Sequence, residues 1–155
     1  MDSEPGQVVS RLLESTKWAD DFSAKEVDAL ARWFVAYTVD KGGAIVREGE
    51  REAFMCLIVE GKVSVTKKGT VPGSRLIQMM GPGTMIGEMS LIDGEPRSAS
   101  VRAAEPTTVL AMNKQDFDRF CDQMPRLALK FVLKIAKLTS QRLRRTSGRL
   151  VDYLE

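Results

Sequence analysis

Near the N-terminus, apolar residues recur at the three- and four-residue spacing that is typical of helices. The first group is Val8, Val9, Leu12 and Leu13, and the second is Val27, Leu30, Ala31 and Phe34. Ser23 precedes the second group and Glu26 follows three residues later, which is the pattern of a capping box. We therefore predict a helical part over residues 8–34. Its aromatic residues are predicted to be core anchors rather than stacking platforms, namely Trp18, Phe22 and Trp33.

From residue 35 onward, apolar residues come in short runs separated by glycines, which is the pattern of β-strands joined by tight turns. The predicted strands are 37–39, 44–46, 53–59, 63–65, 75–80, 85–86, 100–103 and 107–112. Short strands at this interval indicate an antiparallel sandwich or barrel. We therefore predict a β part that extends over residues 35–113.

Helical spacing returns after Asn113, which stands where the N-cap of a helix over 114–123 is expected. Pro125 begins a second, long helix, and Gly148 weakens it near its end, so its last turns are expected to be mobile without ligand. Its apolar face, expected to be buried, consists of Leu129, Val132, Leu133, Ala136, Leu143, Leu150 and Leu154. Between Met124 and Val151 there is no Asp or Glu, whereas eight basic residues occur: Arg126, Lys130, Lys134, Lys137, Arg142, Arg144, Arg145 and Arg149. This basic stripe is either a solvated face or a surface for an acidic partner or nucleic acid.

The absence of histidine limits the chemistry of this chain. It removes Ser-His-Asp and Cys-His nucleophiles and argues against a His-ligated metal or haem. Two cysteines are too few for an iron–sulfur cluster, and no catalytic motif is present, so we expect a protein that is not an enzyme. The longest apolar run, 53–59, is too short for a membrane span, and the acidic N-terminus lacks a signal-peptide core. We therefore expect a cytoplasmic protein.

One stretch, residues 87–101, combines turn-forming residues with two opposite charges. Gly87 allows close approach of the backbone, and Glu88 follows it where a short helix is able to begin. Pro96 restricts the chain just before Arg97, whose planar fork suits a phosphate. Free amides at the helix start and after Arg97 are expected to add an anion nest, and the carboxylate accepts a sugar hydroxyl. This pattern predicts a ligand that carries a phosphate and a ribose hydroxyl close together.

Residues 87–101 resemble the phosphate-binding cassette of the cyclic nucleotide-binding domain family, and we call them the cassette. The matching residues are Gly87, Glu88, Pro96, Arg97, Ser98 and Ala99. The resemblance covers about residues 34–153 and implies a β jelly-roll barrel with N-terminal helices and a long C-terminal helix, as one domain over 1–155. It implies that Glu88 holds the ribose 2′-hydroxyl and that Arg97 pairs with the cyclic phosphate. The implied cassette contacts are Gly87, Glu88, Met89, Arg97, Ser98 and Ala99.

The resemblance also bears on the base of the nucleotide. It implies that Val65 and Ile77 line the pocket near the base, although plain core positions are the commoner role of such residues. The C-terminal helix is similar to that of bacterial cyclic-AMP receptor proteins, which implies that Thr146 and Ser147 recognise adenine. Ser98 leaves the base open, because a hydroxyl after the arginine resembles cyclic-GMP-selective sites, yet bacterial cyclic-AMP regulators also carry Ser there.

The function implied is a non-catalytic sensor that prefers cyclic AMP to cyclic GMP, with no cofactor besides this ligand. Its C-terminal helix is expected to move on binding, and the movement is read by an unknown protein effector or by a second copy in a homodimer. No helix-turn-helix segment follows the long helix in this chain, so we expect no DNA-binding domain here. Because no apolar run is long enough to cross a bilayer, we expect no membrane partner either. The alternative is a jelly-roll interaction module that has lost its ligand.

Overall fold

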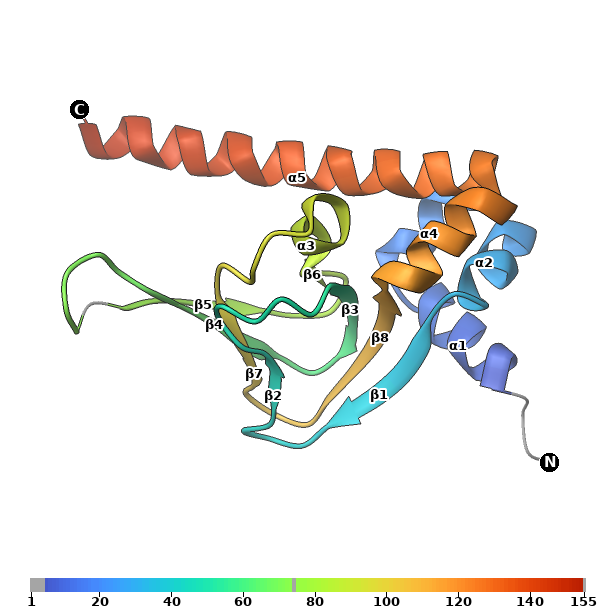
Figure 1. The fold of residues 1–155 in the computed structure, drawn as a ribbon, viewed down its shortest axis with the longest axis horizontal. Coiled ribbons are helices and arrows are strands. Elements are labelled where there is room, and N and C mark those ends of the chain that lie inside the picture. Colours follow the sequence, from blue (N-terminus) through green and yellow to red (C-terminus); the bar gives the residue numbers. More distant parts are fainter. Residues whose placement is uncertain (1–4, 74, 155) are drawn as a thin grey trace. The chain divides into compact units, whose positions relative to one another are not determined.

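The computed structural model describes residues 5–73 and 75–154 (Figure 1). These residues form two compact units, one up to Phe117 and one from Asp118 onward. The first unit contains the N-terminal helices and all the described strands, and the second contains most of the C-terminal helices. The order of helices, strands and helices is therefore the predicted one.

The N-terminal helical part consists of α1 (Pro5–Glu14), the short 3₁₀ helix η1 (Lys17–Asp21) and α2 (Ala24–Ala31). The capping box is confirmed, because the Ser23 hydroxyl accepts a hydrogen bond from Glu26 N at 3.2 Å, and Ser23 N donates to Glu26 Oε1 at 2.9 Å. Trp18 and Phe22 are buried, as predicted for core anchors, and Trp33 is half-buried. The sequence pattern did not predict η1, because a single 3₁₀ turn has no apolar periodicity of its own.

Two antiparallel four-stranded sheets make up the β part. The strands are β1 (Val35–Val39), β2 (Ala44–Val46), β3 (Phe54–Glu60), β4 (Val63–Lys68), β5 (Arg75–Met80), β6 (Met85–Ile86), β7 (Ser100–Ala103) and β8 (Thr107–Asn113). One sheet has the order β1-β8-β3-β6 and the other the order β2-β7-β4-β5. The short helix α3 (Glu88–Asp93) lies in the connection from β6 to β7, so the cassette joins the edge of one sheet to the interior of the other.

The core between the sheets takes residues from both of them. Its buried members are Val46, Cys56, Ile58, Val63, Ile86, Val101 and Val109. The central strand β3 is buried from Met55 to Val59 without alternation. A strand that is covered on both faces reads as a continuous apolar run, which is why the sequence shows one here. The predicted β architecture is thus confirmed.

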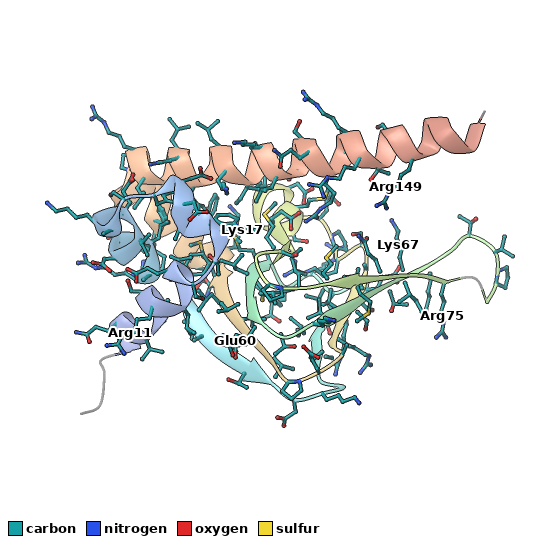
Figure 2. All side chains as sticks on the ribbon, turned by 180° about the vertical axis from the view of Figure 1, so that it is seen from behind. Arg11, Lys17, Glu60, Lys67, Arg75 and Arg149 are labelled. Atoms are coloured by element: carbon teal, nitrogen blue, oxygen red, sulfur yellow. The ribbon has the colours of Figure 1, made fainter. Side chains whose placement is uncertain are left out.

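The β4–β5 hairpin extends beyond the rest of the sandwich (Figure 1). Figure 2 labels Lys67 and Arg75, which lie on its two strands. Its register pairs Val65 with Gln78 and Thr66 with Ile77. Because side chains alternate between the two faces of a sheet, this register decides which hairpin residues face the core.

The C-terminal part contains α4 (Lys114–Gln123) and α5 (Pro125–Leu154). The predicted N-cap is confirmed, because Asn113 Oδ1 accepts a hydrogen bond from Asp116 N at 2.8 Å. Within the second unit, the rings of Phe120 and Phe131 stack with their centroids 5.8 Å apart. None of the described helices combines the length and the apolar character that a membrane crossing requires.

The predicted buried face of α5 is wrong. Leu129, Leu133 and Leu143 are 61%, 59% and 65% exposed. The buried residues of this helix are instead Leu127, Ala128, Phe131 and Ile135. The helix carries two apolar stripes, each with helical spacing, and spacing alone does not tell which of them is buried. Leu150 and Leu154, the last members of the predicted face, have side chains outside the described residues.

Candidate functional site

The cassette begins with a glycine that no other residue replaces easily. Gly87 has φ = +77°, in the left-handed region, and precedes the first turn of α3. A Cβ atom added there would lie 2.6 Å from the carbonyl oxygen of Phe54 and would collide with the guanidinium of Arg97. In this structure the groups that lie close to the Gly87 backbone are the Arg97 guanidinium and the Phe54 carbonyl, and the approach of a ligand at Gly87 stays a prediction.

Glu88 and Arg97 are the only charged side chains that are buried among the described residues, with 3% and 5% exposure. Charged side chains are almost never fully buried unless a partner compensates them. These two residues are also the pair that the sequence predicts to hold a ribose and a phosphate. The fold therefore buries two opposite charges, each of which costs desolvation free energy, within a single loop.

The Arg97 guanidinium is held by neutral groups. Its Nη1 donates to the carbonyl oxygen of Gly87 at 3.1 Å, and its Nη2 donates to the carbonyl oxygen of Phe54 at 2.5 Å. Its Cζ lies 4.4 Å from the centre of the Phe54 ring. The third nitrogen, Nε, is buried without a partner, and no carboxylate of the described residues forms an ion pair with this arginine. Three of the five N–H donors of this guanidinium therefore make no hydrogen bond within the described residues, and its charge has no ion-pair partner there.

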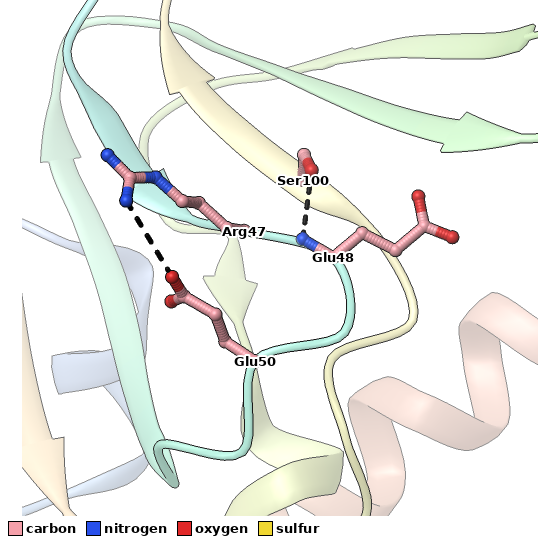
Figure 3. A network of polar contacts seen from close by, with 4 residues as sticks. All are labelled: Arg47, Glu48, Glu50 and Ser100. Atoms are coloured by element: carbon pink, nitrogen blue, oxygen red, sulfur yellow. Dashed lines mark hydrogen bonds and ion pairs between the residues drawn. The ribbon is translucent and has the colours of Figure 1, made fainter.

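The backbone of the cassette is joined to the β2–β3 connection. Arg97 N donates to Glu50 O, and Gly49 N donates to Arg97 O, both at 2.9 Å. A further bond from Glu48 N to the Ser100 hydroxyl, also 2.9 Å, lies beside the exposed Arg47–Glu50 ion pair at 3.8 Å (Figure 3). The N–H groups of Ser98 and Ala99 take no part in the bonds that join these two loops in the described structure. These contacts therefore fix the main chain of Arg97 on both sides.

The thiol of Cys56 does not neutralise the arginine. Burial raises the pKa of Cys56 to about 12, against the opposing effect of the Arg97 charge. Burial lowers the pKa of Arg97, whereas Cys56 and the carboxylates of Glu52, Glu88 and Glu50 raise it. An arginine stays protonated in proteins, and a thiol with this pKa stays neutral at pH 7, so the buried positive charge persists.

The other predicted cassette residues differ in their exposure. Met89 is 60% exposed and Ser98 is exposed, whereas Ala99 is half-buried. Thr146 and Ser147 lie on the exposed side of α5, where the Thr146 hydroxyl donates to Arg142 O at 3.0 Å. In the first unit, the structure therefore brings together Gly87, Glu88 and Arg97.

The two residues predicted to lie near the base fall on opposite faces of the β4–β5 hairpin. Val65 packs against the core, but Ile77 is 63% exposed and pairs with Thr66 on the outer face. Gln78 shares the face of Val65, as does Met80, which packs against the core. The sequence offered no signal for this register, because it depends on how the hairpin pairs across its loop.

Phe54 is the residue of the site that sequence reasoning missed. It is half-buried at the start of β3, under the Arg97 guanidinium. It also lines a cavity of about 400 Å³ between β1, β2, β3 and β8, together with Tyr37, Glu50, Glu52 and Cys56 among others. As the first apolar residue of an apolar strand, Phe54 carries no sequence signal that separates it from a core residue.

These features define a class of protein: an antiparallel β-sandwich in which one helical loop buries a carboxylate and a guanidinium. The chain belongs to the cyclic nucleotide-binding domain family, whose sequence model matches residues 37–124. The family resemblance of the cassette is thereby confirmed.

Relatives and solved structures agree with this family. A cyclic nucleotide-gated potassium channel of Mesorhizobium japonicum is 40% identical over 99 residues, which are 64% of this chain and 26% of the channel. The cyclic AMP receptor protein of Thermus thermophilus is 32% identical over 120 residues, 77% of this chain and 54% of that protein. A cyclic nucleotide-binding domain from Methylobacillus flagellatus superposes with a TM-score of 0.79 at 30% identity, covering 94% of this chain and 82% of that one. The predicted jelly-roll fold is confirmed, and the chain spans about a quarter and about half of the two curated relatives.

Replacing Gly87 by Ala should destabilise the protein more than replacing Gly94 by Ala. Both glycines have positive φ, but a Cβ at Gly94 meets no atom within 4 Å. Left-handed strain costs about 1–2 kcal/mol at either position, and displaced packing at Gly87 adds about 1–3 kcal/mol. Urea unfolding of the two variants measures the difference. Equal loss in both would show that Arg97 and Phe54 move aside without cost.

Cys56 should resist alkylation in the folded protein. With a pKa of about 12, roughly one thiol in ten thousand is a thiolate at pH 8, and burial blocks access as well. Iodoacetamide followed by mass spectrometry should label the half-buried Cys121 first, and both cysteines once urea is added. Labelling of the two at similar rates without urea would contradict the burial of Cys56.

Proposed function

We propose that this chain is a non-catalytic sensor domain that binds a cyclic nucleotide at its cassette. The observation that carries the proposal is the buried Arg97, whose charge no ion pair offsets in the described residues and whose Nε has no partner. A phosphate oxygen supplies the missing acceptor and the missing negative charge together. Glu88, buried on the same loop, supplies the acceptor for a ribose hydroxyl.

Two further features favour a nucleotide over a free anion. The chain is similar to proteins named for cyclic AMP or cyclic nucleotides, among them a receptor protein and a channel. The inner face of the β4–β5 hairpin offers apolar and amide groups to a base, at Val65, Gln78 and Met80. Gln78 adds a side chain that both donates and accepts hydrogen bonds, which suits recognition of a base edge.

We assign the preference for cyclic AMP to Thr146 and Ser147. Because the Thr146 hydroxyl donates to Arg142 O, its remaining lone pairs are acceptors. An acceptor suits the exocyclic amine of adenine, and guanine carries a carbonyl oxygen at that position. Ligand binding then favours one position of α5 relative to the β-sandwich, and the two units work as one sensor domain.

The exposed stripe of α5 supports pairing with a second copy of the chain. Leu129, Leu133, Ala136, Ser140, Leu143 and Ser147 alternate at spacings of four and three residues, and the sequence continues this spacing at Leu150 and Leu154. Such spacing is the seam of a two-stranded coiled coil. In this proposal the seam joins two copies, and the basic stripe beside it stays in solvent or meets an acidic effector.

Isothermal titration with cyclic AMP and cyclic GMP tests the proposed function. Saturable binding with tighter affinity for cyclic AMP is expected, and the nucleotide should be recovered intact with or without magnesium. Absence of binding to either nucleotide would favour the alternative, an interaction module of the same fold that has lost its ligand. Turnover to the open nucleotide would contradict the non-catalytic assignment.

Replacing Arg97 by Ala should weaken cyclic AMP binding more than tenfold, and replacing Glu88 by Ala should weaken it less. Charge-assisted bonds contribute about 1.5–3 kcal/mol each, and Arg97 offers more than one. The matched control is Arg102→Ala, because Arg102 is an exposed arginine on β7 that donates to Gly42 O. Unchanged titration of the Arg97 variant, or an equal loss in the Arg102 variant, would contradict the site.

Replacing both Thr146 and Ser147 by Ala should lower cyclic AMP affinity several-fold to a hundredfold, at about 0.5–1.5 kcal/mol for each hydrogen bond. Cyclic GMP should lose less, so the ratio of the two affinities shrinks. Thr139→Ala, on the same helix but outside the seam, is the control, because the Thr139 hydroxyl likewise donates to the carbonyl oxygen four residues earlier. If the double variant keeps full affinity and full preference, the base is recognised elsewhere, and Gln78 and Ser98 become the next candidates.

A further inference from the structure

The ring of Phe54 and its backbone carbonyl hold the same guanidinium. The Cζ of Arg97 lies 4.4 Å from the ring centre, and Nη2 donates to the Phe54 carbonyl oxygen at 2.5 Å. Gly87 O accepts from Nη1 on the other branch of the fork. Two carbonyls and a ring face therefore restrict the guanidinium, and Nε is left without a partner.

We propose that Phe54 is a positioning residue for the phosphate site, because its ring holds Arg97 in the orientation that receives the anion. This inference rests on the proposed function of the cassette. A guanidinium over an aromatic face is attracted by the ring, and the attraction grows when water is excluded, as it is around a side chain that is 5% exposed. The ring itself accepts none of the N–H donors, unlike a carboxylate, so it orients the arginine without competing with an anion for them.

Order in the empty site matters because an arginine side chain has many rotamers. Fixing such a side chain on binding costs free energy that would otherwise appear as affinity. With the ring in place, the side chain is already ordered in the folded protein, so binding does not lose this conformational entropy. Without it, two carbonyl hydrogen bonds remain, and the phosphate must also select the correct rotamer.

The surroundings of Phe54 make it a good residue to replace. It is half-buried, packs against the edge of the core and lines the cavity of about 400 Å³, so a smaller side chain there enlarges an existing space. Tyr37 lines the same cavity and is 54% exposed. Phe54→Leu and Tyr37→Leu thus remove an aromatic ring from one cavity, but only the first ring lies under Arg97.

Titration of the full chain with cyclic AMP should show Phe54→Leu weakened roughly three- to thirtyfold, which is the range expected for a cation–π contact. Phe54→Tyr keeps the ring face and should bind within about twofold of the native chain, and Tyr37→Leu should do the same. Urea unfolding run in parallel separates positioning from a general loss of structure. The expected result is a similar, small change in stability for the two leucine variants.

A second measurement does not depend on any ligand. Protons above an aromatic ring are shifted upfield in NMR spectra, so the side-chain signals of Arg97 should be shifted in the native chain and in Phe54→Tyr. The shift should disappear in Phe54→Leu and persist in Tyr37→Leu. Assignment by comparison with Arg97→Lys identifies the signals.

The outcomes are distinguishable. A native chain that binds no cyclic nucleotide overturns the proposed function and the inference that rests on it, even if the NMR shift is present. A native chain that binds, with Phe54→Leu binding equally well, overturns the inference alone. Tighter binding by Phe54→Leu also overturns it, because the ring would then hold Arg97 away from the phosphate.

Discussion

The burial of one positive charge organises this structure. Removing a guanidinium from water is costly, and the cost falls only when its donors find acceptors and its charge finds a partner. Around Arg97 the fold supplies two carbonyl oxygens and a ring face, but no ion pair among the described residues. A site that holds a guanidinium in place but leaves Nε without an acceptor and the charge without an ion pair is suited to an anionic ligand. The stability lost in the empty state is returned when the anion binds.

That constraint explains the local sequence. Gly87 must be glycine, because its left-handed backbone brings its own carbonyl to Arg97 and leaves no room for a Cβ. The β2–β3 connection lies against the cassette, because its backbone forms hydrogen bonds with both the N–H and the carbonyl oxygen of Arg97. Phe54 must follow directly, because its carbonyl and ring complete the cradle. Two segments distant in the sequence, residues 49–54 and 87–97, therefore meet at one side chain.

The C-terminal helix α5 carries two apolar stripes, of which one is buried and the other exposed. Its buried stripe stabilises the described structure, and its exposed stripe has the regular spacing of a helix that pairs with another helix. In the proposed function, ligand binding needs an element that can take two positions, and the long helix with a second, exposed apolar stripe is the element we assign to that role.

The amino-acid sequence alone determined the strands, the caps at Ser23 and Asn113, and the presence of Glu88 and Arg97 in one loop. These features depend on neighbours a few residues away, through alternation, capping and turn chemistry, so local patterns are sufficient. Tertiary structure decided which apolar stripe of α5 is buried, since both stripes satisfy the same period. It also decided that Ile77 faces outward while Gln78 shares the face of Val65, because hairpin register is a pairing property. Phe54 belongs to the site only because the fold places β3 beside the cassette. Its contact with Arg97 joins residues 43 positions apart, and no local sequence pattern predicts such a contact.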